Sequence, residues 1–277
     1  MEDGVRFVSA AAVSLEAFAA AFTSAFAGYP VPVAVDAVWL SRRARYEQHD
    51  LLNSLVAFEG AEAVGTAILG VRGERGWVAG FGVVPRWRGR GLACRLMSEL
   101  VGRARASGLR RLSLEVLQGN TAAVRLYERA GMSHTRDLLI LERPADWAGP
   151  AAGRAGALTE APAEELLEHF TRLHTEPAAW QREPVGLLTA KLRGLYLGPR
   201  SRPRACAILK YTEEGEALLS DLGAADARQA RALCAALGGL SGLLKLQNEP
   251  ERSPFVAPLL EHGFAEVLRQ HEMSMEL

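Results

Sequence analysis

The chain has few of the residue types that mark secreted and membrane-spanning proteins. Its 277 residues include only three cysteines, Cys94, Cys206 and Cys234. An odd and scattered set of this kind forms neither a metal-ligand pattern nor a disulfide framework, and it suits a reducing cytoplasm. No run reaches the roughly 18–20 apolar residues of a membrane span, because Glu16 interrupts the Ala- and Phe-rich stretch 10–27. We therefore expect a cytoplasmic protein with no membrane partner and no metal.

An excess of either charge is also missing. The 32 basic and 32 acidic residues give a formal net charge of zero, so nothing in the overall charge attracts nucleic acid. The distribution is uneven, because residues 86–111 hold eight arginines and one acid, Glu99. This basic segment is either a solvated helix face or electrostatic support for a bound phosphate group, and both can hold at once.

The segment Arg86–Ala93, RWRGRGLA, carries the most informative pattern of the chain. It follows an apolar run, residues 77–84, and it opens an amphipathic segment, so the order is strand, glycine-rich turn and helix. Glycines permit a tight turn. The first turn of a helix presents unpaired N–H groups at the positive end of the helix dipole. Together these features predict a site for a phosphate group.

Two common phosphate loops do not match this segment. A Walker loop requires a lysine followed by a hydroxyl residue, and neither is present. A Rossmann turn requires G-x-G-x-x-G, but Cys94 takes the third glycine position after Gly89 and Gly91. What remains is R-x-x-G-x-G from Arg86, with an ordinary glycine-containing turn as the alternative reading.

The residues around this turn fit a larger pattern of helices and strands. Apolar side chains recur at helical spacing over residues 92–104, which predicts a helix with one buried face. Residues 112–117 alternate as a strand does. Asn120 can cap a second helix, and Gly131 suits the C-terminal end of that helix. A last strand is expected over residues 132–141.

This combination resembles the core of the GNAT superfamily of N-acetyltransferases, from its fourth strand to its seventh. The pattern V-x-P-x-x-R-G-x-G over residues 83–91 carries the resemblance, together with Asn120, Tyr127 and Gly131. The resemblance implies an α/β protein (an α+β mixed sheet) with the GNAT acyl-CoA N-acyltransferase fold. The earlier residues predict the elements that this fold needs before the loop: strand 5–9, helices 13–27 and 36–46, strands 55–58 and 63–69, and strand 77–84.

The resemblance also implies a set of residues that bind acetyl-CoA. The loop would hold the pyrophosphate through backbone N–H groups, the end of the preceding strand would pair with the pantetheine arm, and an asparagine would contact that arm or simply cap its helix. The residues expected in these roles are Val83, Val84, Arg88, Gly89, Arg90, Gly91, Leu92, Ala93 and Asn120.

Tyr127 matches the general acid of the family. A phenol with a pKa of about 10 is protonated at neutral pH, whereas the leaving thiol has a pKa nearer about 8.5. Full proton transfer is then uphill by about 2 kcal/mol. We therefore expect Tyr127 to act mainly by donating a hydrogen bond to the developing thiolate; a core tyrosine is the alternative.

The general base stays open at the level of sequence. The strand over residues 77–84 has no carboxylate, whereas Glu115 lies on the next strand. Glu47 and His49 follow the second helix, where family members bind the acceptor, although a surface position is their simpler interpretation. A water chain and the carboxylate of Leu277 are further options.

The second half of the chain repeats this plan in a degenerate form. We expect a catalytic domain over 1–145, a linker over 146–157 and a GNAT-like domain over 158–277, with helices 162–173 and 187–195 in its first part. No R-x-x-G-x-G is present in the second half. Asp226 puts negative charge where a pyrophosphate would sit. An unrelated α+β domain is the alternative.

These observations favour an acetyl-CoA-dependent N-acetyltransferase acting on an amine of a small molecule or a protein. An acyl-CoA-binding sensor on the same fold is the main alternative, because fold does not fix function. A pure interaction scaffold is the third reading, and an intact phosphate loop argues against it. Either a monomer or a homodimer fits the sequence.

Overall fold

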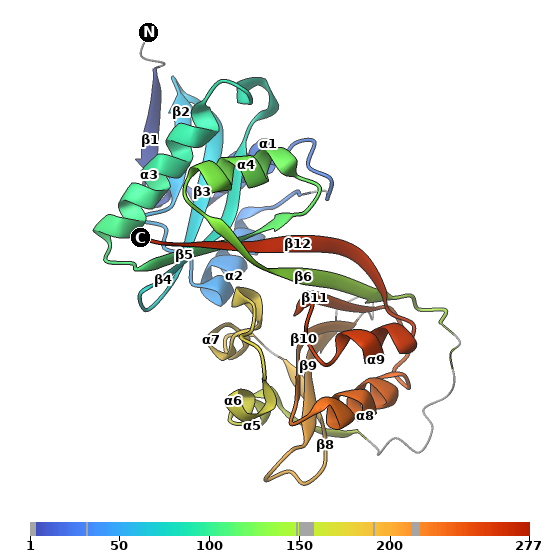
Figure 1. Cartoon of the computed structure of the whole chain (residues 1–277). Helices are drawn as coiled ribbons and strands as arrows, with labels where there is room; N and C mark the ends of the chain where they lie inside the picture. Colours follow the sequence, from blue (N-terminus) through green and yellow to red (C-terminus); the bar gives the residue numbers. More distant parts are fainter. Residues whose placement is uncertain (1–3, 32, 148, 150–157, 191, 212–216) are drawn as a thin grey trace. The chain divides into compact units, whose positions relative to one another are not determined.

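The computed structural model describes residues 4–31, 33–147, 149, 158–190, 192–211 and 217–277. The chain forms two compact units (Figure 1). The first unit is Met1–Thr135 together with Glu272–Leu277, and the second unit is Arg136–His271. Each has its own buried core.

These units differ from the predicted domains 1–145 and 158–277 in two places. Strand β6 (Ser133–Arg143) leaves the first unit after Thr135, and strand β12 (Ala265–Glu276) re-enters it at Glu272. Within the first unit, the Thr135 hydroxyl donates to the Glu272 carbonyl at 2.8 Å. The sequence could not place these strand ends, because their partners are far away in the chain. The predicted linker 146–157 falls mostly outside the described residues.

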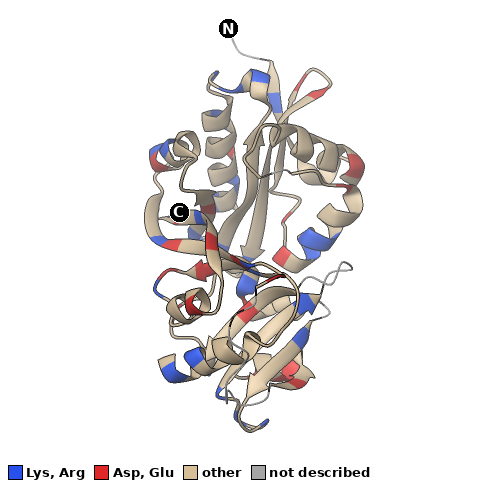
Figure 2. Ribbon diagram, turned by 90° about the vertical axis from the view of Figure 1, so that its right-hand side faces the viewer, with Lys and Arg blue, Asp and Glu red and all other residues tan. Residues whose placement is uncertain are grey.

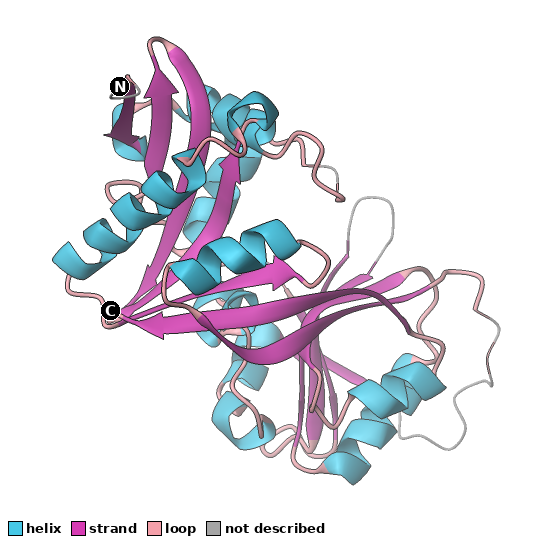
Figure 3. Cartoon of the chain, turned by 45° about the horizontal axis from the view of Figure 1, so that its top comes forward, coloured by secondary structure: helices cyan, strands magenta, loops and turns pink. Residues whose placement is uncertain are grey.

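The first unit is a mixed sheet with helices on both faces (Figure 3). Its strands are antiparallel neighbours up to β4, and β4 pairs in parallel with β5. Their order is β1 (Val5–Ser9), β2 (Leu55–Glu59), β3 (Glu62–Arg72), β4 (Arg75–Val83), β5 (Arg111–Leu117) and the end of β12. Short 3-10 turns cover Ala10–Ala12 and Pro85–Trp87.

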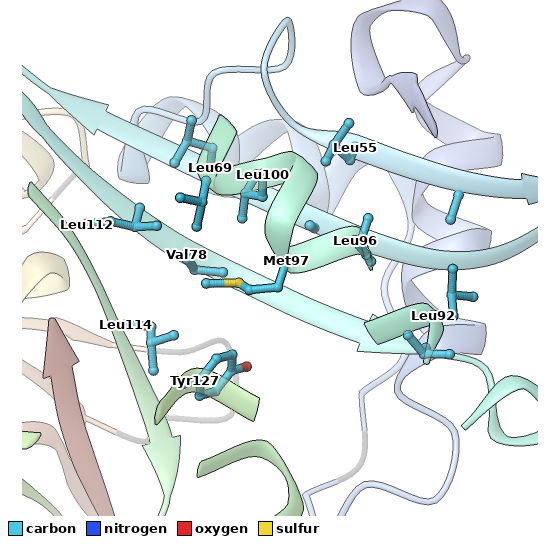
Figure 4. Close-up of a cluster of buried hydrophobic side chains, with 14 of the residues drawn as sticks. Leu55, Leu69, Val78, Leu92, Leu96, Met97, Leu100, Leu112, Leu114 and Tyr127 are labelled. Carbon is cyan, nitrogen blue, oxygen red and sulfur yellow. The ribbon is translucent and has the colours of Figure 1, made fainter. Parts of the chain in front are cut away.

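Two cores lie on opposite faces of this sheet. Helices α1 (Leu15–Ala25) and α2 (Ala37–Glu47) cover one face through Phe18, Phe22 and Leu40. Helices α3 (Leu92–Ala106) and α4 (Thr121–Arg129) cover the other face. Figure 4 shows the leucines of α3 and the ring of Tyr127 on this second face. The amphipathic pattern over residues 92–104 is thereby confirmed as a helix with one buried side.

Glycines in β4 allow α1 to lie directly against the strand. A β-carbon on Gly80 would come within 2.5 Å of the Phe22 ring, and one on Gly82 would meet Ala25 at 3.0 Å. Any larger residue at these positions would push α1 away from the sheet. The close approach fixes the loop after α1 beside the end of β4.

The second unit repeats the strand directions of the first. Its sheet runs β7, β8, β9, β10, β11 and β6, with only the β10–β11 pair parallel among the pairs from β7 to β11. The strand bounds are Thr159–Pro162, Arg193–Leu197, Ala205–Tyr211, Ala217–Ala224 and Leu244–Pro250 for β7 to β11. The helices are α5 (Ala163–Leu167), α6 (Phe170–Leu173), α7 (Pro184–Leu187), α8 (Ala227–Leu237) and α9 (Val256–Glu261), with a 3-10 turn at Trp180–Arg182.

Two of the predicted helices in the second half need correction. The helix expected over 187–195 is wrong, because α7 ends at Leu187 and β8 begins at Arg193. The stretch 162–173 is broken into the end of β7 and two short helices. Gly194 allows α5 to pack closely on β8, because a β-carbon there would come within 2.5 Å of Leu166 Cδ1. Of the leucines whose spacing suggests a helix, only Leu195 lies in β8, where it is buried, whereas Leu188 is exposed.

Three features of the whole chain can be compared with the expectations from sequence: its helix lengths, its charge distribution and its thiols. In the part of the chain that the structure describes, no helix is long and apolar enough to cross a bilayer. Figure 2 shows both signs of charge on the ribbon of each unit. All three cysteines are free thiols; Cys94 is exposed, whereas Cys206 and Cys234 are buried.

Candidate functional site

The first unit opens a gap in its own sheet next to the glycine-rich loop. Strands β4 and β5 pair only from Arg75–Arg111 to Trp77–Ser113. A bulge between β3 and β4 follows at once, where Ile68 faces Gly80 but Leu69 faces Val78. Bulges bend a strand and increase its twist. The C-terminal half of β4 therefore diverges from β5 and leaves one edge without a strand partner.

Val83 and Val84 differ in how their backbone groups are used. The Val84 N–H donates to the Val64 carbonyl at 3.0 Å, and the Val84 carbonyl accepts from Trp87. Because successive residues of a strand point to opposite edges, Phe81 and Val83 face the gap. The expectation that Val84 pairs with a pantetheine arm is therefore wrong, since both of its groups are occupied. Phe81 is a residue that the sequence analysis missed.

The loop itself is shaped by two glycines with left-handed backbone. Gly89 has φ 74° and Gly91 has φ 82°, a region in which other residues are strained. No atom lies within 4 Å of the place where a β-carbon would stand on either residue. The space above the loop is therefore open to a ligand.

Helix α3 begins at this loop with its N-terminus uncapped. Gly91 is the N-cap residue, and it has no side-chain oxygen with which to satisfy the first N–H groups. The N–H groups of Leu92 and Ala93 have no partner within the helix, by helix geometry. Together with the helix dipole, they form a ready site for an anion.

Arg88 holds the loop in place rather than facing the open space. Its Nε donates to the Val83 carbonyl at 2.9 Å, and its Nη2 donates to the carbonyls of Ala25 and Ala27 at 3.2 and 2.8 Å. This guanidinium therefore ties the end of α1 to the end of β4. The Arg88 side chain therefore braces the loop, and the expected role of Arg88 in holding a pyrophosphate stays a prediction.

The rest of the basic segment is largely committed to other partners. Only Arg90 stands at the loop without a hydrogen-bond partner among the described residues, and it lies over the Trp87 ring at 5.7 Å. The others reach acids or main-chain and side-chain oxygens: Arg86 pairs with Glu62, Arg95 with the Val5 carbonyl, Arg103 with Glu99, Arg110 with Glu74 and Arg111 with Ser274. Arg105 lies in the last turn of α3, away from the loop.

Asn120 acts as the N-cap of α4. Its Oδ1 accepts from the Ala123 N–H at 3.3 Å. The capping part of the prediction is thereby confirmed, and contact with a bound arm stays a prediction. The cap fixes the start of the helix that carries Tyr127.

Tyr127 is a buried residue of α4, and its ring contacts Phe81, which faces the gap between β4 and β5. Its ring meets Phe81 edge-on at 6.1 Å, and its residue is only 6% exposed. Burial, with a smaller effect of Tyr29, raises the pKa of Tyr127 well above its usual value. Among the described residues, its hydroxyl has no hydrogen-bond partner. Figure 4 shows the hydroxyl turned away from Leu114.

Glu115 is held on β5, just beyond the last paired residues. Its Oε2 accepts from Trp77 Nε1 at 2.7 Å. Because Leu114 and Val116 face the α3 core, strand alternation puts Glu115 on the opposite face, which α1 and α2 cover. This face is where the sequence analysis expected an acceptor.

Glu47 and His49 are buried, which corrects the expectation of a surface position. Glu47 is 1% exposed and contacts Arg43, and its Oε2 lies 2.9 Å from His49 Nε2. The backbone of His49 forms a bridge with Gly70 of β3. Among the described residues, His49 Nδ1 is buried without a partner.

The C-terminal residue lies beside the start of β5, at the end of the sheet opposite the glycine-rich loop. The Leu277 N–H donates to the Arg110 carbonyl at 2.8 Å, just before β5 begins. That end of β5 pairs with the start of β4, whose nine residues span about 27 Å at the usual rise. The option of a base supplied by Leu277 stays a prediction.

The family to which the first unit is similar agrees with the geometry of this site. Residues 17–132 match the model of the acetyltransferase (GNAT) family. The first unit carries a GNAT acetyltransferase domain. The matched range includes the diverging strands, the loop and Tyr127, so the site described above lies within the GNAT domain.

Solved structures extend the likeness beyond the GNAT domain to the whole chain. A GCN5-related N-acetyltransferase from Sphaerobacter thermophilus matches with a TM-score of 0.72 at 17% identity, covering 100% of this chain and 96% of the other. A tandem GNAT protein from the clavulanic acid biosynthesis pathway matches at 0.69 and 14%, covering 98% of each. A GCN5-related N-acetyltransferase from Kribbella flavida matches at 0.63 and 18%, covering 98% and 72%. At these identities the likeness establishes the fold alone.

Proposed function

We propose that the protein is an acetyl-CoA-dependent N-acetyltransferase that acts on a primary amine of a small molecule or a protein. The observation that carries this proposal is the uncapped N-terminus of α3 at Gly91, placed beside the unpaired edge of β4. The first feature fits a pyrophosphate and the second fits an extended amide-bearing arm. We place this reaction in the cytoplasm, where three free thiols stay reduced.

Acetyl-CoA would supply the activated acetyl group at this site. The N–H groups of Gly89, Gly91, Leu92 and Ala93 would hold its phosphates, with Arg90 adding charge from the side. The backbone of Phe81 and the N–H of Val83 would align the pantetheine arm along β4, because the Val83 carbonyl accepts from Arg88 Nε. The Arg88 side chain keeps the end of β4 in place by tying it to the end of α1. Asn120 fixes α4, so that the phenol stands at the gap.

Tyr127 would donate a hydrogen bond to the leaving sulfur. Because burial raises the pKa of Tyr127, the phenol keeps its proton at neutral pH and remains a donor. A raised pKa also makes complete proton transfer more uphill than for an exposed phenol. The phenol therefore stabilises negative charge on sulfur, and solvent completes the protonation.

Glu115 is our candidate for accepting the amine proton. It lies on the face of the sheet covered by α1 and α2, and Trp77 Nε1 orients its carboxylate. A carboxylate oriented in this way can accept a proton from an amine, directly or through one water. A role of Glu47 and His49 at the same face is the alternative.

We propose that the second unit takes no part in binding CoA. Asp226 caps α8 there by accepting from the Gln229 N–H at 2.8 Å. The carboxylate satisfies one N–H of the first turn of α8 and puts negative charge there, whereas Gly91 has no side chain at the start of α3. Leu259 of α9 is fully buried in the second core, where the first unit has Tyr127.

Calorimetric titration with acetyl-CoA and with CoA, followed by Tyr127→Phe, tests this function. We expect micromolar binding of acetyl-CoA, and in the variant unchanged affinity with turnover lower by about 10²–10⁴-fold, the scale of a positioned acid or base. Binding without turnover on any amine would favour the sensor alternative. Absence of binding to either ligand would overturn the proposal.

A further inference from the structure

One charge that develops in the proposed reaction still has no side-chain donor. Glu115 takes the amine proton and Tyr127 faces the leaving sulfur, but the carbonyl oxygen of the thioester also becomes negative when an amine adds to its carbon. The free backbone groups at the end of β4 align the pantetheine arm. A further hydrogen-bond donor beside the gap between β4 and β5 would complete the site.

The end of α1 lies directly against the part of β4 that borders this gap. A β-carbon on Gly82 would meet Ala25 at 3.0 Å, so the helix and the strand are in close contact there. Arg88 Nη2 donates to the carbonyls of Ala25 and Ala27, at 3.2 and 2.8 Å, and so holds the first residues after the helix. The chain is thereby fixed at the C-terminal end of β4 just before Tyr29.

A stack of aromatic rings sets the position of Tyr29. Its ring meets the Phe26 ring edge-on, with 5.3 Å between the ring centroids, and the Phe26 ring lies 4.6 Å from that of Phe22. Phe22 in turn packs on β4 at Gly80. The Tyr29 N–H donates to the Phe26 carbonyl at 3.0 Å, which closes the turn after α1. Ring contacts and a turn therefore hold the half-buried phenol in place.

The hydroxyl of Tyr29 is available to a ligand. It makes no hydrogen bond among the described residues, and its ring stacks with the aromatic side chains on the face of the sheet that α1 and α2 cover. Burial raises the pKa of Tyr29, so the phenol keeps its proton at neutral pH. It can therefore donate a hydrogen bond to an oxygen that becomes negative.

Tyr127 approaches the same gap from the other face of the sheet. Its ring contacts Phe81, on the side that α3 and α4 cover. After burial, the interaction with Tyr29 is the second cause that raises the pKa of Tyr127, so the two phenols lie within electrostatic reach of each other. The backbone of paired strands separates side chains on opposite faces of a sheet. At the unpaired end of β4, two phenols from opposite faces can serve one reacting group.

We propose that Tyr29 is a second catalytic tyrosine, whose hydroxyl donates a hydrogen bond to the carbonyl oxygen of the bound thioester. This role rests on the proposed function of the first unit. Tyr127 then faces the sulfur, and Tyr29 faces the oxygen on the same carbon. A donor aimed at the position where negative charge develops stabilises the transition state more than the bound substrate.

The electrons of the transfer are accounted for by three side chains. The amine nitrogen bonds to the carbonyl carbon and loses its proton to Glu115, while the electron pair of the C=O π bond moves onto the oxygen that Tyr29 contacts. That pair then re-forms the C=O bond as the C–S bond breaks. The sulfur leaves with the bonding pair, stabilised by Tyr127 until solvent protonates it, and Glu115 returns its proton to solvent.

Infrared spectroscopy of the full chain, with acetyl-CoA isotopically labelled at the acetyl carbonyl, tests this contact. A hydrogen bond to a carbonyl oxygen lowers the stretching frequency of the C=O bond. We expect the bound thioester to absorb at a higher frequency in Tyr29→Phe than in the wild-type protein. Tyr127→Phe should leave the frequency unchanged, because that phenol faces the sulfur. An unchanged frequency in Tyr29→Phe would overturn the proposal.

Steady-state turnover is the second measurement. Tyr29→Phe keeps the ring stack and removes only the hydroxyl, so acetyl-CoA affinity and the KM for the amine should stay as in the wild type. The kcat should fall about 10²-fold, the scale of one lost oxyanion donor. Tyr211→Phe, which removes an exposed hydroxyl from β9 of the second unit, is the control and should change none of these values. A raised KM for the amine with kcat preserved would assign Tyr29 to the amine and overturn the proposal.

The role of Tyr29 and the proposed function fail in different ways. A wild-type protein that binds no acetyl-CoA, or that binds it without turnover on any amine, would overturn both together. Binding and turnover in the wild type, with Tyr29→Phe equal to it in carbonyl frequency and in kcat, would overturn only the role of Tyr29. Unchanged acetyl-CoA affinity in the variant shows that it is folded.

Discussion

In each unit the two parallel strands separate next to a bulge, and the two openings are used in opposite ways. In the first unit β4 leaves β5 after Trp77, and in the second β10 leaves β11 after Leu219. A bulge follows the last paired residue in both. The first opening is left to backbone groups and an uncapped helix, whereas in the second Arg182 bridges β10 and β11.

The comparison shows that backbone topology provides the opening and a few side chains decide its use. Gly91 leaves the N-terminus of α3 without a cap, and Asp226 closes the equivalent end of α8. One fold can therefore hold a ligand between its strands or replace that ligand with an internal ion network. The second choice costs desolvation, which only complete pairing offsets.

The largest expected effect comes from breaking the network of the second unit. Arg182→Leu leaves Asp221 and Glu249 buried with one cation, which should cost about 3–5 kcal/mol of unfolding free energy. Hydrogen exchange should rise in peptides of β10 and β11 and stay unchanged in β3 and β4. Arg200→Leu, which breaks an exposed pair with Glu165, is the control and should leave exchange as it was. Equal protection in the two variants would show that Arg182 is not needed to hold the strands.

Acetyl-CoA affinity should depend on the absence of a side chain at Gly91 of the loop. Gly91→Val forces a β-branched residue to φ 82° and crowds the open space above the loop. Acetyl-CoA affinity should fall at least about 100-fold, or about 2.7 kcal/mol. Gly102→Ala, in the same helix and with open space at its β-carbon, is the control. A folded Gly91→Val protein with normal affinity would refute the loop assignment.

Matched glycine changes compare how each unit packs a helix against the strand that leaves its parallel partner: α1 on β4 in the first unit and α6 on β10 in the second. Gly80→Ala brings a methyl within 2.5 Å of Phe22, and Gly223→Ala brings one within 3.0 Å of Leu173 and 3.1 Å of His174. Overpacking of this kind costs about 1–3 kcal/mol, with the larger value at Gly80. Urea unfolding followed by exchange of peptides from each unit measures both. A larger loss of unfolding free energy for Gly223→Ala than for Gly80→Ala would mean that the backbone of β4 shifts to relieve the contact with Phe22.

The smallest effect is a pH dependence confined to the second unit. The pKa of His174 is raised in the folded protein, so its stabilisation is fully present below the unfolded pKa of about 6.5 and is lost as pH rises through the folded pKa. Unfolding free energy of this unit should therefore fall with rising pH in that window. His174→Gln should flatten the dependence. A slope of the opposite sign in the wild-type protein would contradict the charged form of His174.

Local sequence signals predicted the parts of the site that depend on neighbouring residues. The glycine pair, the amphipathic helix after it and the Asn120 cap each follow from short-range geometry, and the structure confirms them. The bracing contacts of the Arg88 side chain could not be predicted, because its partners Ala25 and Ala27 are more than 60 residues away. The prediction that Val84 pairs with the pantetheine arm was wrong for a similar reason, because the register between β3 and β4 decides which edge of the strand a residue faces.

By itself, then, the sequence determined the turn, the helices and the chemical types at the loop, because backbone conformation and amphipathic period act over a few residues. Only the tertiary structure decided that residues 272–277 return to the first unit and that β8 is a strand. It also decided that Arg182 gathers Asp221 and Glu249 into one network. Strand pairing and charge burial join distant segments, and their free energy depends on neighbours that no local pattern records.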